Sequence, residues 1–123
     1  MQHLRELPPQ MLERFTRLDP RSELALVALD PESREIVAVG RYAPNPGGNT
    51  AEFGLTVADA WQHQGLGRAL LERLCEAARM HGYEALCGHV LADNRDMLQL
   101  AARLGFLPAG RAGAELTVMR RLR

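Results

Sequence analysis

The sequence predicts an α/β fold built on a mixed sheet, in one domain over residues 1–123. Three features indicate this fold. Short apolar segments separated by turn residues fill the first half, an amphipathic helix pattern begins at residue 65, and a strand pattern follows that helix. A strand–helix–strand unit after an antiparallel meander implies a right-handed crossover, and therefore a sheet with both parallel and antiparallel pairs.

The first half of the chain is expected to hold a short helix and then three strands. Prolines at the start of residues 8–17 favour a helix there. Asp30-Pro31-Glu32-Ser33 is typical of a type I turn, and the glycines and prolines of residues 44–49 indicate a loop. These breaks separate the strands predicted at residues 24–29, 35–42 and 51–57.

The second half alternates helices and strands. Leucine and alanine recur at helical spacing over residues 65–81, and Gly82 is a typical helix stop. Asp93 and Asn94 can cap a second helix, which ends near Gly105. Strands are predicted on either side of this second helix, at residues 84–91, 106–108 and 115–121.

Composition argues against several classes of function. Fifteen basic residues balance fifteen acidic ones, so no net charge draws the chain to nucleic acid or to an anionic membrane. No apolar run approaches the roughly 20 residues of a membrane span, and the first residues do not resemble a signal peptide, so we expect a cytoplasmic protein. Cys75 and Cys87 lack metal-ligand spacing, so we interpret them as reduced packing residues and expect no metal.

The loop Gln62-His63-Gln64-Gly65-Leu66-Gly67 carries the strongest functional signal, because it joins a strand to the start of a helix. The first amides of a helix lack intrahelical partners and lie at the positive end of its dipole, so they can bind a phosphate. Gly65 and Gly67 would let the backbone approach the anion, and Arg68 can add a charged contact.

Glycines before a helix occur in several kinds of loop, and the neighbouring residues exclude two of them. A dinucleotide-binding fingerprint would need a third glycine where Leu70 stands, and a P-loop would need lysine, which the chain lacks. A glycine-softened loop that binds no ligand would have the same pattern, and this possibility stays open.

Three segments together resemble a known family. Gln62-x-x-Gly65-x-Gly67 is similar to the acetyl-CoA motif of the GNAT superfamily of N-acetyltransferases, and residues 88–98, with Leu104-Gly105-Phe106, resemble its second conserved block. With AEFGLTVADAWQ, these segments look most like the GNAT domain of Pat-type bacterial protein lysine acetyltransferases. The resemblance implies a GNAT-type acyl-CoA N-acyltransferase fold with acetyl-CoA as co-substrate.

The resemblance also implies roles for individual residues. The backbone of the strand before the loop would hold the pantetheine arm, the amides from Gln64 to Ala69 would wrap the pyrophosphate, and Asn94 would lie near the pantetheine or the sulfur. His63 is the one histidine expected near the cofactor, whereas His81 and His89 are expected in surface or packing roles. The implied cofactor-binding residues are Leu55, Thr56, Val57, Gln62, His63, Gln64, Gly65, Leu66, Gly67, Arg68, Ala69 and Asn94.

Glu52 corresponds to the glutamate that acts as general base in Pat-type enzymes. The chemistry is reasonable, because a lysine amine with a pKa of about 10.4 must lose a proton before it attacks a thioester. Strand alternation places Glu52, Gly54 and Thr56 on one face. The plain alternative is an exposed, solvated glutamate.

The sequence departs from the family pattern in two places. Ala101 stands where many GNAT enzymes carry a tyrosine as general acid, which leaves the acid unassigned. The usual first strand and helix also look absent. Without that first strand a sheet edge would be exposed, and a homodimer could cover it.

The function that follows is acetyl-CoA-dependent N-acetyl transfer to a protein lysine, by direct transfer with Glu52 as general base. The resemblance implies an acyl-CoA synthetase as a partner. Two alternatives stay open: acetylation of a small amine, and a regulatory module that binds acyl-CoA without turnover.

Overall fold

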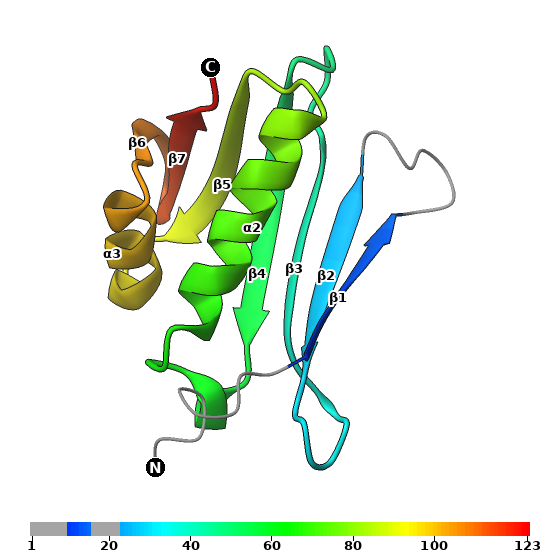
Figure 1. The fold of residues 1–123 in the computed structure, drawn as a ribbon. Helices are drawn as coiled ribbons and strands as arrows, with labels where there is room; N and C mark the ends of the chain where they lie inside the picture. Colours follow the sequence, from blue (N-terminus) through cyan, green and yellow to red (C-terminus); the bar gives the residue numbers. More distant parts are fainter. Residues whose placement is uncertain (1–9, 16–22) are drawn as a thin grey trace.

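A computed structural model describes residues 10–15, as backbone alone, and residues 23–123. The elements run in chain order as β1 (Gln10–Phe15), β2 (Leu24–Leu29), β3 (Ile36–Pro44), β4 (Thr50–Val57), the 3₁₀ turn η1 (Asp59–Trp61), α2 (Leu66–Met80), β5 (Ala85–Leu91), α3 (Arg95–Arg103), β6 (Leu107–Ala112) and β7 (Glu115–Arg121). Figure 1 shows them as one sheet with the helices packed on it.

The sheet is mixed, as predicted. Its seven strands follow the order β1-β2-β3-β4-β5-β7-β6, with β4 and β5 parallel and every other neighbouring pair antiparallel. The helix α2 connects the parallel pair, which makes the strand–helix–strand unit that the sequence indicated.

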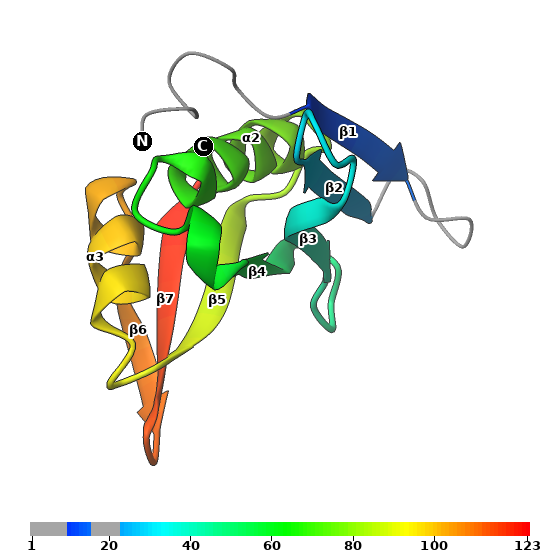
Figure 2. The ribbon, with the colours of Figure 1, turned by 90° about the horizontal axis from the view of Figure 1, so that it is seen from below.

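The core lies between the sheet and the two described helices. Leu70, Leu71 and Leu74 of α2 are fully buried, and Ala101 of α3 is buried beside them. Figure 2 shows α2 and α3 on the same side of the sheet. We call the opposite side, which bears Glu52, Thr56, His89 and Thr117, the open face, because no helix in the described part of the chain covers it.

The structure corrects the helix expected over residues 8–17. Residues Gln10–Phe15 form β1, which pairs antiparallel with β2 from Gln10↔Leu29 to Phe15↔Leu24. Gln, Met, Leu, Glu and Arg favour helices as isolated residues, but strand pairing outweighs such propensities. The rest of the predicted helix lies outside the described residues.

The presence of β1 also corrects the expectation that a first strand is absent. Because β1 covers the outer edge of β2, that edge is not exposed, and the reason for a homodimer there no longer applies.

The predicted type I turn is wider in the structure. The Arg34 amide donates to the Asp30 carbonyl at 2.8 Å, one residue beyond a type I closure, and Arg34 has a φ of 67°. The Asp30 side chain also accepts from the Glu32 amide at 2.9 Å. The side chain–backbone bond stabilises this wider turn, which the Pro-based turn rule does not anticipate.

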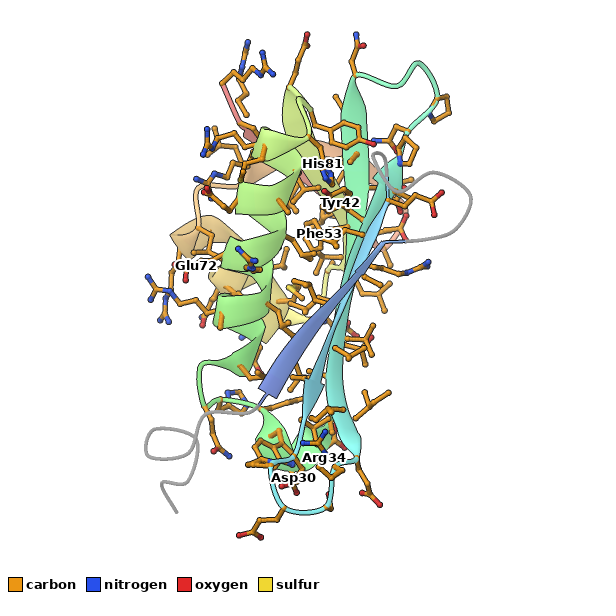
Figure 3. All side chains as sticks on the ribbon, turned by 45° about the vertical axis from the view of Figure 1, so that its right-hand side comes forward. Asp30, Arg34, Tyr42, Phe53, Glu72 and His81 are labelled. Carbon is orange, nitrogen blue, oxygen red and sulfur yellow. The ribbon has the colours of Figure 1, made fainter. Side chains whose placement is uncertain are left out.

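Phe53 fills the space that a side chain at position 88 would need. A Cβ on Gly88 would lie 2.3 Å from Cε2 of Phe53. The Phe53 ring points between the sheet and α2 (Figure 3) and meets the Phe106 ring edge-on, with centroids 5.3 Å apart. Gly88 is therefore required by packing, since β5 can pass this ring only without a side chain.

We predict that Gly88→Ala lowers the free energy of unfolding by about 1–3 kcal/mol, because the added methyl group overpacks the Phe53 ring. Urea denaturation measures this loss. Gly110→Ala is the matched control, because its Cβ would meet Thr117 at an ordinary 3.9 Å. Equal stability of the two variants would contradict this account of Gly88.

Candidate active site

The strands β4 and β5 pair at only three positions and then separate. Thr50, Ala51 and Glu52 pair with residues of β5, and Glu52↔Cys87 is the last pair. The strand β4 continues to Val57 and β5 to Leu91, so both strands extend well beyond their last shared pair (Figure 1). The β4 edge after Glu52 therefore offers unpaired backbone groups within the described sheet.

The predicted cofactor-binding residues of β4 lie along this edge. Leu55 and Val57 direct their side chains to the core under α2, and Thr56 is exposed on the open face. The Val57 carbonyl accepts a hydrogen bond from Gln62 Nε2 at 3.0 Å. The backbone of Leu55 and Thr56 is therefore more available to a ligand than the Val57 carbonyl.

The loop that follows β4 is held in place by its own side chains. Gln62 Nε2 also lies 3.3 Å from Asp59 Oδ1, and Gln64 Nε2 donates to the Ala60 carbonyl at 3.3 Å. Trp61 packs against the core. Gln62 and Gln64 thus brace the loop, which positions the start of α2.

The N-terminus of α2 is uncapped. Gly65 is the cap residue in the left-handed region, with a φ of 88°, and no side chain accepts from the first-turn amides. No acidic residue lies in the first turn, although helices usually place one there. The amides of Leu66, Gly67 and Arg68 lack intrahelical partners by helix geometry, whereas the Ala69 amide donates to the Gly65 carbonyl at 3.0 Å.

The two glycines of the loop differ in their surroundings. A Cβ on Gly65 would meet nothing within 4 Å, so this position is open and its positive φ favours glycine. A Cβ on Gly67 would point inward, 3.4 Å from Leu100 and 3.7 Å from Leu55 and Val57. At Gly67 the helix α2 thus faces β4 and α3 at distances that are ordinary for a Cβ, and of the two glycines only Gly65 leaves open space beside the loop.

The start of α3 lies next to the loop. Asn94 caps α3 by accepting from the Met97 amide at 3.2 Å, as predicted, and its Nδ2 makes no hydrogen bond with the described residues. His63 Nε2 lies 3.3 Å from Asp96 Oδ2, and both side chains are largely exposed. Arg68 is half-exposed, and its Nε lies 3.4 Å from Glu72 Oε2. These exposed side-chain contacts can be displaced by an anion at little cost.

Glu52 lies on the open face where the pairing of β4 and β5 ends. Its side chain is 47% exposed, and His89 Nε2 of β5 lies 3.6 Å from its Oε1. The carboxylate is thus reachable from solvent and adjacent to the unpaired strand edge.

Sequence reasoning missed the proximity of His89 to Glu52. Period-two alternation places His89 and Cys87 on the same face of β5, and this signal is present in the sequence. The sequence does not reveal the register that places Cys87 beside Glu52, because the register of a parallel pair depends on the packing of α2.

Other unusual titratable groups lie at the far end of α2. Tyr42 is buried and hydrogen-bonded to His81, next to the C-terminus of this helix (Figure 3), and burial raises the pKa of the Tyr42 phenol. Burial likewise raises the pKa of the Cys75 thiol within α2. A thiol kept protonated fits the packing role expected of Cys75.

Among the described residues, no three or more His, Cys, Asp or Glu side chains are arranged to hold a metal ion. Neither described helix is both long and apolar enough to cross a bilayer.

Comparison with known proteins identifies the family. Residues 2–106 match the Acetyltransferase (GNAT) family. Acetyltransferase PA5475 of Pseudomonas aeruginosa is 32% identical over 106 residues, which cover 85% of this chain and 57% of that protein. The chain thus spans little more than half the length of this relative.

Solved structures share the fold. The GNAT domain of PAT from S. lividans superposes with a TM-score of 0.76 at 26% identity, covering 88% of this chain and 65% of that one. The protein yncA of Salmonella typhimurium, solved with its cofactor acetyl-CoA, has a TM-score of 0.71 at 23% identity, covering 82% and 65%. A Streptococcus pneumoniae acetyltransferase of the GNAT family has a TM-score of 0.77 at 16% identity, covering 91% and 99%.

The family match over residues 2–106 agrees with the separation of β4 from β5 and with the uncapped start of α2. The chain belongs to the acetyltransferase (GNAT) family.

Proposed function

We propose that this chain transfers an acetyl group from acetyl-CoA to an amine. The observation that carries the proposal is the position of Glu52, at the point where β4 and β5 stop pairing. Family membership supports acetyl transfer, and yncA, which shares the fold, was solved with acetyl-CoA. The unpaired β4 edge and the free amides of α2 give a donor of this shape two separate anchors.

In this proposal the pyrophosphate of acetyl-CoA binds the amides of Leu66, Gly67 and Arg68. These donors lie at the positive end of α2, and Arg68 adds a charged contact after leaving Glu72. Gln62, His63 and Gln64 shape the loop, and Gly65 leaves room beside it. The Ala69 amide has a smaller part than the resemblance implies, because it already bonds to Gly65.

The pantetheine arm would pair with the β4 edge at Leu55 and Thr56, near Val57. A chain of amides bonding to an unpaired strand edge satisfies backbone groups that otherwise need water. The Nδ2 group of Asn94 is available as a further donor, since its Oδ1 caps α3.

Glu52 would act as the general base. The carboxylate accepts a proton from the incoming ammonium group, and the amine then attacks the thioester carbonyl. As the C–S bond breaks, the nitrogen loses its second proton, which passes through solvent to the departing thiolate. The departing thiolate has an ordinary pKa of about 8.5, so water can protonate it and no dedicated acid is required at Ala101. Base catalysis of this kind contributes roughly 10²–10⁴ in rate.

The acceptor we propose is a lysine side chain of a protein. Glu52 is nearly half exposed on the open face, where a side chain presented by a large partner can reach it. The similarity to the GNAT domain of S. lividans PAT supports this choice. An acyl-CoA synthetase as that partner remains a prediction.

Glu52→Gln is expected to lower kcat by about 10²–10⁴-fold, because glutamine cannot accept the proton. Release of free thiol from acetyl-CoA measures the rate, with an acyl-CoA synthetase and a panel of small amines as acceptors. Glu76→Gln is the matched control, since Glu76 is an exposed carboxylate on α2 paired with Arg79.

The choice of acceptor separates the alternatives for the wild-type chain. Turnover with the small amines alone would replace the protein substrate, and binding of acetyl-CoA without turnover would favour a regulatory module. A wild-type rate in Glu52→Gln would remove Glu52 as the base.

Gly65→Glu is expected to weaken acetyl-CoA binding by at least about tenfold, because a carboxylate would stand beside the amides that receive the pyrophosphate. Isothermal titration calorimetry measures the affinity. Gly47→Glu is the control, because Gly47 also has a positive φ and open space but lies in the β3–β4 loop. Unchanged affinity in folded Gly65→Glu would move the pyrophosphate site elsewhere.

A further inference from the structure

His89 lies between groups from two different strands on the open face. Its Nε2 atom is 3.6 Å from Glu52 Oε1 of β4. On the other side of the ring, Nδ1 is 3.1 Å from Thr117 Oγ1 and 3.8 Å from Glu115 Oε1, both on β7. The imidazole therefore connects the proposed base to β7 across β5.

The strand pairing keeps this arrangement in place. His89 and Thr117 are direct partners in the antiparallel β5–β7 pair, and they belong to the seven consecutive paired positions of that ladder. A cross-strand pair of this kind fixes one side of the ring while the other side faces β4. Glu52, opposite Cys87, is the last β4 residue that pairs with β5, and the two strands have already separated at the level of His89.

We propose that His89 is a positioning residue for Glu52. The Thr117 hydroxyl donates to Nδ1, which leaves the proton on Nε2, and Nε2–H donates to the Glu52 carboxylate. This contact turns the carboxylate toward the unpaired β4 edge. The proposal rests on Glu52 being the general base.

The length of the contact is compatible with this role. A separation of 3.6 Å exceeds that of an ordinary hydrogen bond, but catalytic hydrogen bonds are commonly long without substrate and shorten in the reacting complex. His89 is 38% exposed, so the side chain has room to make this small movement. Glu115 Oε1 lies 3.8 Å from Nδ1, beyond hydrogen-bonding distance, so the nearer Thr117 hydroxyl at 3.1 Å is the partner of that nitrogen.

Two substitutions at position 89 separate positioning from proton relay. His89→Leu removes both nitrogens and is expected to lower kcat about tenfold, with the KM for acetyl-CoA within about twofold of wild type. His89→Gln retains an N–H donor and is expected to stay within about threefold of the wild-type kcat. A relay would need a titrating ring, so equal losses in both variants would overturn the positioning role.

A double-mutant cycle with Glu52 is the decisive experiment. In a Glu52→Gln background, His89→Leu should change the rate of thiol release by less than about twofold, because the group that it positions is gone. Fully multiplicative losses would show that His89 acts independently of Glu52 and would overturn the proposal. Thr117→Val, which removes the far-side partner, provides a milder variant and should lower kcat about two- to fivefold.

The outcomes distinguish this inference from the proposed function. If Glu52→Gln retains the wild-type rate, the base assignment fails and the role of His89 fails with it. If Glu52→Gln loses activity while His89→Leu does not, the proposed function stands and the inference alone is wrong.

Discussion

The arrangement of the site depends on the separation of β4 from β5 after Glu52. Parallel neighbours usually bond along their shared length, but here the pairing stops after the third position. The Phe53 ring lies against Gly88 immediately beyond that position. The Phe53–Gly88 packing thus lies at the point where β4 and β5 separate, and the unpaired β4 edge begins there. Glu52 is the last paired residue of β4 before that edge.

The second proposed anchor for the ligand is the start of α2, where no side chain accepts a hydrogen bond from the first-turn amides. Most helices bring a polar side chain or a carboxylate to their first turn. Here glycine occupies the cap, arginine lies in the first turn, and the glutamines of the loop bond to carbonyls within the loop. The side chains thus stabilise the loop without accepting from the first amides of α2. These amides can therefore bind an anion without prior rearrangement.

Much of the fold followed from the sequence, because the pattern and the local signals agreed. The helix at 65–81, the cap at Asn94 and the antiparallel meander all match the structure to within a residue or two. The helix over residues 8–17 was wrong, since residue propensity there was outweighed by pairing with β2. The inward orientation of Gly67 and the contact of His89 with Glu52 depend on tertiary register, which no local pattern carries.

In the proposed complex, one ligand spans both anchors, with its sulfur end beside Glu52. A crystal structure of the chain with acetyl-CoA tests this most directly. We expect pantetheine amides bonded to the β4 edge at Leu55 and Thr56, and pyrophosphate oxygens on the amides of Leu66 to Arg68. A complex in which the thioester lies away from Glu52, or in which the β4 edge is unoccupied, would contradict it.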